Sequence, residues 1–183
     1  MIIFYLFFNN QSFQFQYEWK SAIVTPLYKN KGIKTDLNNY RGISVLPPIA
    51  KIFEKILAMQ ITIYLKLNNI LFSGQHGFRN GHSCETALHK QLINLLLFID
   101  FRKAFDLIDS RLLLRKLFHY GFDTSALNLI ANYFTDRFQT VKFNNKKSNL
   151  MSLNLGVPQG SVLGPLFFLL FINNLAFIFE LYC

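Results

Sequence analysis

The chain has 183 residues, of which 51% are hydrophobic and 21 are phenylalanine. This length suits one domain, or two small lobes that share a core, and excludes a multidomain machine. Lysine and arginine outnumber aspartate and glutamate by 19 to 10, so the formal net charge is +9. Such a surplus is expected of proteins that meet nucleic-acid phosphates or anionic membranes, and equally of a protein whose charge serves only solubility.

Cysteine usage and targeting patterns suggest a compartment. Cys84 and Cys183 lie far apart without a CxxC pattern, which argues against a disulfide framework. The apolar first eight residues lack the basic start of a signal peptide. The apolar run 163–182 contains the pair Asn173-Asn174, whose amides would be costly in lipid. We expect a reduced intracellular protein, nuclear or cytoplasmic and not secreted, with a buried helix in place of a membrane span.

The first expected elements are two short strands. Residues 21–28 (SAIVTPLY) alternate and include β-branched side chains, which predicts a strand. A basic turn at 29–32 and a polar loop at 36–40 lead to a second strand at 42–46. Together they form a flap suited to lie on an anion.

A helix and a loop follow the flap. Pro47-Pro48 suit the first turn of a structural helix that Asn68-Asn69 ends. Its apolar residues recur at helical spacing; they are Ile49, Ile52, Phe53, Ile56 and Leu57. Residues 73–81 are rich in glycine and polar groups and predict a loop, after which Ser83 can cap a helix over 84–93.

Asp100 is the first residue that suggests chemistry. The run 95–101 is otherwise apolar, the pattern of a strand buried on both faces. An ionised carboxylate there is costly unless it binds a cation or a base, so Asp100 is a candidate ligand for Mg²⁺. Asp106 is equally compatible with a metal role and with capping, whereas Asp109 is expected to cap a helix. Only Asn94 separates this strand from the preceding helix, a tighter junction than usual.

Two capped helices are expected next. Asp109 or Ser110 can cap a helix over 111–120, and Asp123 or Thr124 can cap a second helix. The order of helices and strands is mixed rather than strictly alternating, so the predicted class is α+β.

A hairpin and a glycine-rich turn complete the pattern. Residues 138–143 and 150–155 alternate and predict strands that flank a turn at 144–147. The segment 156–165 (GVPQGSVLGP) holds three glycines and two prolines. Glycines let a backbone approach a ligand closely, and Gln159 can donate and accept at a base or sugar edge. A plain loop is the alternative.

Five blocks in this order resemble the reverse transcriptase domain of non-LTR, LINE-type retrotransposons, close to the jockey-like elements. They are WKSAIVTPLYK (19–29), NNYRGISVL (38–46), GQHGFRNGHSCETAL (74–88), FIDFRKAFDLID (98–109) and GVPQGSVLGPLFFLLFINNL (156–175). The resemblance implies a fragment of an RNA-directed DNA polymerase whose partners are an RNA template, a DNA primer and dNTPs, without a small-molecule cofactor. It predicts no oligomeric state.

The resemblance also implies an architecture. The α+β fold would be a partial right-hand polymerase, with fingers and an incomplete antiparallel palm sheet packed on helices. After a poorly defined segment at 1–17, residues 18–94 would form the fingers-like part and residues 95–183 the incomplete palm of one truncated domain.

Individual residues acquire roles from the same resemblance. Asp100 matches the first catalytic carboxylate, which with the carbonyl of Phe101 would hold two Mg²⁺ ions that activate a primer 3′-OH and stabilise the leaving pyrophosphate. Phe105 matches the aromatic residue under the incoming sugar, whose bulk rejects a 2′-OH. Arg41 and Lys29 match the basic fingers residues that grip the triphosphate.

The glycine-rich turn and the departures complete the comparison. Pro158, Gln159 and Gly160 match the turn that packs against the template and nascent pair. The family's aromatic-Ala-Asp-Asp motif, with two of the three catalytic carboxylates, is absent from these 183 residues, so we expect no polymerase activity from them alone. Asn174 stands where aspartate is usual, and Gly42 where proline is usual.

Other interpretations compete with an enzyme. The charge surplus also suits a non-catalytic nucleic-acid-binding remnant, and the apolar C-terminal run suits a membrane-associated protein. His82, Cys84 and His89 do not predict a zinc site, because a fourth ligand is not evident and the spacing is unusual. His76 and Arg79 either touch template phosphate or stabilise their own turn.

Overall fold

The computed structural model describes residues 14–79, 81–83, 85, 101 and 103–175. Its strands and α-helices are β1 (Ser21–Tyr28), β2 (Tyr40–Val45), α1 (Pro48–Leu67), α3 (Ser110–His119), α4 (Thr124–Phe134), β3 (Phe138–Phe143), β4 (Lys146–Lys147), β5 (Met151–Ser152) and α5 (Leu163–Ile172). Short 3-10 helices, η1 (Tyr17–Lys20) and η2 (Leu37–Asn39), precede β1 and β2. The predicted α+β class is confirmed as a mixed sheet with helices.

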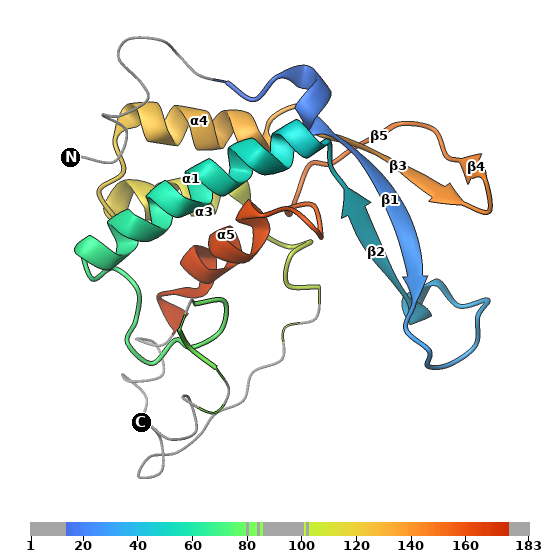
Figure 1. Ribbon diagram of the computed structural model, residues 1–183, viewed down its shortest axis with the longest axis horizontal. Helices are drawn as coiled ribbons and strands as arrows, with labels where there is room; N and C mark the ends of the chain where they lie inside the picture. The colour runs from blue at the N-terminus through green and yellow to red at the C-terminus, as the bar shows by residue number, and fades with distance from the viewer. Residues whose placement is uncertain (1–13, 80, 84, 86–100, 102, 176–183) are drawn as a thin grey trace.

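The central strand β1 pairs with strands from distant parts of the chain (Figure 1). It runs antiparallel to β2, from Ile23↔Val45 to Tyr28↔Tyr40. It runs parallel to β3, from Ser21↔Phe138 to Val24↔Val141, and β4 and β5 each pair with β3 antiparallel. One sheet therefore takes strands from both sides of residue 95, and a domain boundary at that residue stays a prediction.

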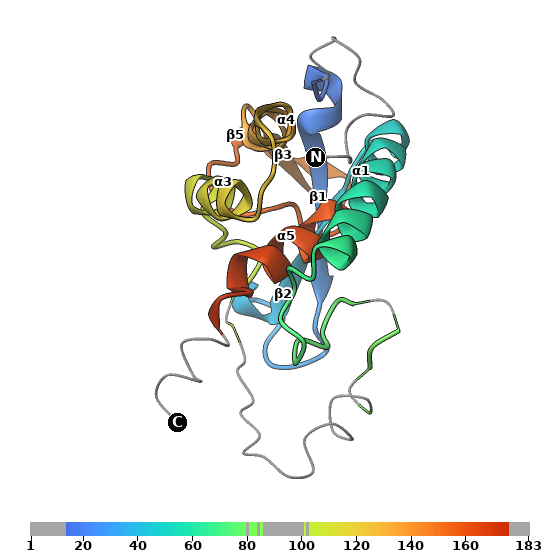
Figure 2. The same cartoon turned by 90° about the vertical axis from the view of Figure 1, so that its left-hand side faces the viewer.

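The four α-helices of the described residues form the second layer. In Figures 1 and 2, α5 lies between α1 and α3, and α4 packs beside α3. Their apolar faces meet in the core, where burial of apolar surface supplies the main stabilisation. The largest of the fully buried side chains are Tyr133, Phe167, Ile61, Leu65, Ile108, Leu113, Leu117, Leu163, Leu169 and Leu170.

Local capping signals predicted α3 and α4 correctly. The Asp109 carboxylate accepts hydrogen bonds from the N–H groups of Arg111 at 2.8 Å and Leu112 at 3.3 Å. The Asp123 carboxylate accepts one from Ala126 at 2.8 Å. These bonds satisfy donors that a helix cannot pair within itself, and they lower the pKa of Asp109. Asp109 is therefore a helix cap, as expected.

The predicted bounds of α1 are confirmed, but its buried face differs from the predicted apolar positions. Ile49 and Ile52 are 49% and 55% exposed. The buried residues recur every three or four positions; they are Ala50, Glu54, Leu57, Ile61, Tyr64 and Leu65. The face that turns to the core thus includes a glutamate.

The predicted hairpin after β3 is present, but its turn is shorter than the predicted 144–147, because Lys146 and Lys147 form strand β4 and pair with β3. Asn144 and Asn145 have φ of 45° and 62°, as a tight asparagine turn requires. The predicted strand 150–155 is too long, because β5 covers only two of its residues. Ser148 interrupts the ladder: its Oγ accepts a hydrogen bond from the Val141 N–H at 3.0 Å, in competition with strand pairing.

The side chain of Asn173 links the end of α5 to the loop after α1 by hydrogen bonds. It is 5% exposed, its Oδ1 accepts from the Phe72 N–H at 2.9 Å, and its Nδ2 donates to the Ile70 carbonyl at 2.9 Å. A buried amide in an apolar helix is stable only with such partners. Across the part of the chain that the structure describes, no helix is both long and apolar enough to cross a membrane.

Candidate nucleic-acid interface

The glycine-rich turn lies against the segment that follows Asp100. The Gly156 N–H donates to the Ile108 carbonyl and the Val157 N–H to the Phe105 carbonyl, both at 2.9 Å. Gly156 has φ +78°, and a Cβ there would lie 2.5 Å from the Phe105 oxygen. Only glycine permits so close an approach in this conformation. Two segments that the sequence singled out separately are therefore in contact.

The same turn also docks on strand β2. The Ser44 N–H donates to the Gln159 carbonyl at 2.7 Å. Gly160 has φ +119°, and a Cβ there would lie 2.7 Å from the Ser44 oxygen. Pro158 is buried, whereas Gln159 and Gly160 are exposed. The turn thus rests on β2 through its backbone and leaves the glutamine accessible.

The predicted basic flap is present as the β1–β2 hairpin. Arg41 is exposed on β2, three residues before Ser44 and so about 10 Å along the extended strand. The Lys29 N–H donates to the Asn39 carbonyl, and its Nζ donates to the Asn38 carbonyl, both at 2.8 Å. Lys29 therefore helps to close its own loop. The expected grip of Arg41 and Lys29 on a triphosphate stays a prediction.

Phe101 and Phe105 belong to an aromatic cluster that packs against Phe168 of α5. The half-buried Phe105 ring lies 5.5 Å from the Phe168 ring and 6.0 Å from the Phe78 ring, between centroids. Phe101 is 39% exposed and its ring lies 5.8 Å from that of Phe168. The Phe105 side chain thus packs on α5 while its carbonyl holds the turn, and its expected role under a sugar stays a prediction.

The expected magnesium site falls largely outside the described residues. Asp100 is one of the residues that the structure does not describe. Asp106 is exposed, and Asp109 caps α3. Among the residues described, no group of three His, Cys, Asp or Glu side chains is placed to hold a metal ion. These residues do not by themselves fit a two-metal site, and the expected role of the Phe101 carbonyl as a metal ligand stays a prediction.

Glu54 is a functional candidate that the sequence reasoning missed. It is 0% exposed, and its Oε2 accepts from the N–H groups of Val162 at 2.6 Å and Leu163 at 3.2 Å. Burial raises the pKa of the Glu54 carboxyl, while these N–H groups and the charges of Arg137 and Lys51 act to lower it. The sequence carries no local signal for this burial, because a glutamate in a helix usually faces solvent.

Arg137 is the buried cation whose charge acts on Glu54. It is 2% exposed, its Nη1 donates to the Tyr133 carbonyl at 2.8 Å, and its guanidinium carbon lies 4.3 Å from the centre of the Tyr133 ring. Burial, and then the Glu54 charge, raise the pKa of the Tyr133 hydroxyl. The core behind the turn therefore holds two opposite charges, the carboxylate of Glu54 on α1 and the guanidinium of Arg137 just before β3.

The raised pKa of Glu54 makes stability depend on pH. The folded protein binds a proton at Glu54 more readily than the unfolded chain does. The resulting stability is fully present below the unfolded pKa of about 4.3 and is lost as pH rises through the folded pKa. We therefore expect the free energy of unfolding to fall with rising pH in the wild type relative to Glu54→Gln. Urea denaturation of both proteins from about pH 4 to about pH 8 measures this pH dependence. If the free energy of unfolding varied with pH in the same way in both proteins, the expectation would be contradicted.

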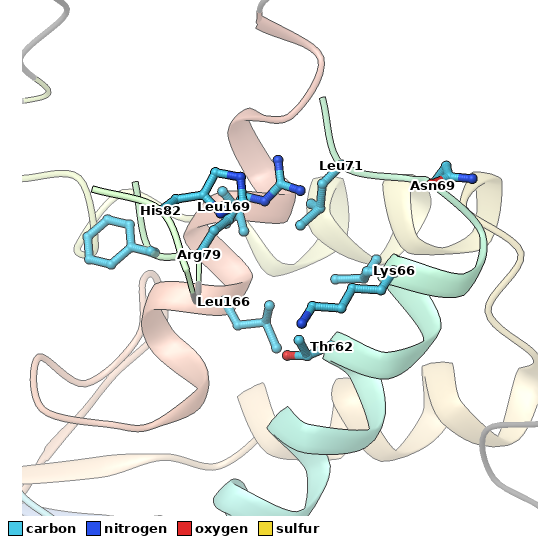
Figure 3. A pocket seen from close by; sticks show the side chains of 10 residues that line it. Thr62, Lys66, Asn69, Leu71, Arg79, His82, Leu166 and Leu169 are labelled. Atoms are coloured by element: carbon cyan, nitrogen blue, oxygen red, sulfur yellow. The ribbon is translucent and has the colours of Figure 1, made fainter. Parts of the chain in front are cut away.

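A separate pocket of about 330 Å³ lies between α1, the loop after it and α5 (Figure 3). Its lining consists of Thr62, Leu65, Lys66, Asn69, Leu71, Phe78, Arg79, His82, Leu166 and Leu169. Arg79 donates through Nη1 to the carbonyls of Phe72 at 2.9 Å and Gln75 at 3.0 Å, in agreement with the turn-stabilising alternative of the two that the sequence left open. Arg79 is also the candidate for a template-phosphate contact named from the sequence, and that role stays a prediction.

Comparisons with known proteins place most of the chain in one family. The family model described as reverse transcriptase (RNA-dependent DNA polymerase) matches residues 28–183. Among curated relatives from Drosophila melanogaster, the probable RNA-directed DNA polymerase from transposon X-element is 31% identical over 180 residues, which cover 88% of this chain and 19% of the relative. The probable RNA-directed DNA polymerase from transposon BS is 30% identical over 172 residues, with 88% and 19% covered.

A third relative from the same organism, the RNA-directed DNA polymerase from mobile element jockey, is 28% identical over 169 residues, with 86% of this chain and 18% of the relative covered. The chain thus spans about a fifth of the length of these relatives. The match of the family model over most of the chain shows that the protein belongs to the reverse transcriptase (RNA-dependent DNA polymerase) family.

Proposed function

We propose that the chain forms part of the RNA-directed DNA polymerase of a non-LTR retrotransposon and that it acts inside the cell on an RNA template, a DNA primer and dNTPs. The observation that carries the proposal is the meeting of the turn 156–160 with the segment 105–108 and with Ser44. Three of the five family-like blocks contribute to this contact. These contacts hold together residues that are remote in the sequence, which supports a shared role for them at the substrates.

In this proposal the turn contacts the template and nascent base pair. Gln159 and Gly160 are exposed and Pro158 is buried beneath them, so the glutamine amide is available to a base or sugar edge. The residues around the turn would belong to a right-hand polymerase with fingers and palm. Asp100 and the Phe101 carbonyl are the proposed magnesium ligands, and bound magnesium would supply charge stabilisation to phosphoryl transfer.

Gln159→Ala tests the template contact. We expect this change to weaken retention of an RNA–DNA primer–template by roughly fivefold, because one hydrogen bond is worth about 1 kcal/mol. The salt dependence should not change, because the lost group is neutral. Filter binding over a range of salt concentrations measures both quantities. Asn154→Ala, which removes another exposed amide close to the turn, is the matched control; equal effects of the two changes would contradict the assignment.

Arg41→Ala tests the triphosphate contact. We expect the affinity for a labelled dNTP to fall about ten- to hundredfold, because a charge-assisted bond to phosphate is worth about 1.5–3 kcal/mol. Lys55→Ala removes the same unit charge from an exposed position on α1 and should change the affinity by less than about twofold. Equilibrium dialysis measures both variants. A loss of the same size in each would assign the effect to net charge.

A non-catalytic nucleic-acid-binding protein is the second candidate, favoured by the +9 net charge. It shares the expected retention of RNA. Incorporation of dNTPs on a primed RNA template, abolished by Asp100→Ala, would exclude it.

A further inference from the structure

We infer that Glu54 is a positioning residue whose carboxylate holds the start of α5, and with it the turn 156–162, in the conformation that template contact requires. The inference rests on the proposed function, in which Gln159 and Gly160 face the template. No part of it requires Glu54 to touch a substrate, because the side chain is 0% exposed.

The first turn of α5 depends on Glu54 for its hydrogen bonds. The helix begins without a capping side chain at its N-cap residue, Val162. The N–H groups of Val162 and Leu163 both donate to Glu54 Oε2. The Gly164 N–H donates to Ser161 Oγ at 3.0 Å, and the proline that follows has no N–H. The donors that a helix start leaves open are therefore satisfied, two of them by a residue of α1.

Glu54 differs in kind from the other attachments of the turn. The hydrogen bonds that join the turn to the segment 105–108 and to Ser44 run between main-chain groups. Glu54 instead reaches from α1 across a sequence separation of 108 residues to Val162, and its negative charge lies at the positive end of the α5 dipole. Loss of this side chain would release one end of the turn while the main-chain bonds at the other end persist.

Stability alone does not explain a carboxylate at this position. Burial is the largest influence on Glu54 and raises its pKa, so the ionised form costs folding free energy. The titratable groups that face it are Arg137, Lys51 and Tyr133, and the cations only partly offset that cost. Well-packed neutral residues often stabilise such a site better than buried charges do. What a carboxylate adds is a directed acceptor for two N–H groups.

Two conservative variants of Glu54 separate the effect of the position of its side-chain oxygens from the effect of its negative charge. Glu54→Gln keeps an acceptor oxygen at the same reach and removes the charge, whereas Glu54→Asp keeps the charge and withdraws the oxygens by about one carbon–carbon bond. Hydrogen exchange of the Val162 and Leu163 amides reports on the start of α5, and that of Ile130 in α4 reports on global opening. We expect Glu54→Asp to accelerate exchange at the two turn amides at least tenfold more than at Ile130.

The remaining variants complete the measurement. Glu54→Gln is expected to change the ratio of turn exchange to Ile130 exchange by less than about threefold, and Glu18→Gln, at an exposed position, to leave it unchanged. Glu54→Asp should also weaken retention of the primer–template about as much as Gln159→Ala does. Combined, the two changes should weaken it little more than either alone, because both act through one turn.

Three results would overturn the inference. Exchange at Val162 and Leu163 that rises only in step with Ile130 would make Glu54 a purely structural residue. The second result concerns binding. If Glu54→Asp accelerated exchange at the turn but left retention of the primer–template unchanged, while Gln159→Ala weakened it, Glu54 would not position the turn for binding. If Gln159→Ala itself has no effect, the proposed template contact fails, and the functional part of the inference fails with it.

Discussion

Gly156→Ala is expected to lower the free energy of unfolding by roughly 3 kcal/mol or more. Left-handed backbone costs an alanine about 1–2 kcal/mol, and a forced overlap in a packed site adds about 1–3 kcal/mol. The overlap is with backbone, because the new Cβ would lie 2.5 Å from the Phe105 oxygen and 2.7 Å from the Asp106 Cα. Neither segment can retreat without breaking the bonds that join them. Urea denaturation measures the loss.

Gly81→Ala is the matched control for Gly156→Ala. Gly81 has φ +77°, close to the +78° of Gly156, but a Cβ there meets nothing within 4 Å. Gly81→Ala should therefore show only the cost of the left-handed backbone, about 1–2 kcal/mol. Equal destabilisation by the two changes would mean that the contact between the turn and Phe105 does not contribute to the fold.

Arg137→Met should be the second large effect, with a loss of about 3 kcal/mol near neutral pH. Removing the Arg137 charge leaves the buried Glu54 carboxylate without a nearby cation whose charge favours its ionised form. Arg137 also donates to the Tyr133 carbonyl and stacks on the Tyr133 ring. Without its charge the pKa of Glu54 should rise further, so the loss should shrink at acidic pH, where Glu54 is protonated. Urea denaturation at two pH values measures the difference.

The Arg137 prediction has a control and a rescue. Arg115→Met removes an exposed arginine from α3 and should stay within about 0.5 kcal/mol of the wild type. In a Glu54→Gln background, Arg137→Met should cost clearly less than in the wild type, because the buried negative charge is already gone. Strictly additive effects would show that the two charges do not interact.

Short-range signals predicted most of the elements. Asp109 and Asp123 each cap a helix through N–H groups two or three residues ahead, so the information lies within one turn of chain. The asparagine pair at 144–145 likewise determines its own turn. The predicted strand at 21–28 has the bounds of β1, because alternation and the following basic turn define it locally.

Long-range pairings were beyond the sequence pattern. Nothing in residues 21–24 specifies a parallel partner at 138–141, because β-strand pairing depends on packing more than on local preference. Glu54 sits in a helical pattern where a glutamate usually faces solvent, and the N–H groups that it accepts from follow more than a hundred residues later. Such a contact becomes visible only when α1 and α5 are packed together.

The candidate site was predicted in part. The order of the blocks nominated Phe105 and the turn at 158–160, and hydrogen bonds join Phe105 to the residue before that turn. Docking of the turn through Ser44 was not predicted, because a main-chain N–H has no sequence signature. Roles in binding template, sugar and metal stay predictions, as does that of Asp100, which lies outside the described residues.

The parallel pairing of β1 with β3 has a consequence for how the polypeptide is made. On a ribosome, the β1–β2 hairpin emerges long before residues 138–141, which occupy the second edge of β1. Throughout that interval one side of the central strand offers free N–H and carbonyl groups to any neighbouring nascent chain. Aggregation therefore competes with folding during synthesis. Slower translation of the intervening segment would lengthen that exposure and lower the yield of folded protein.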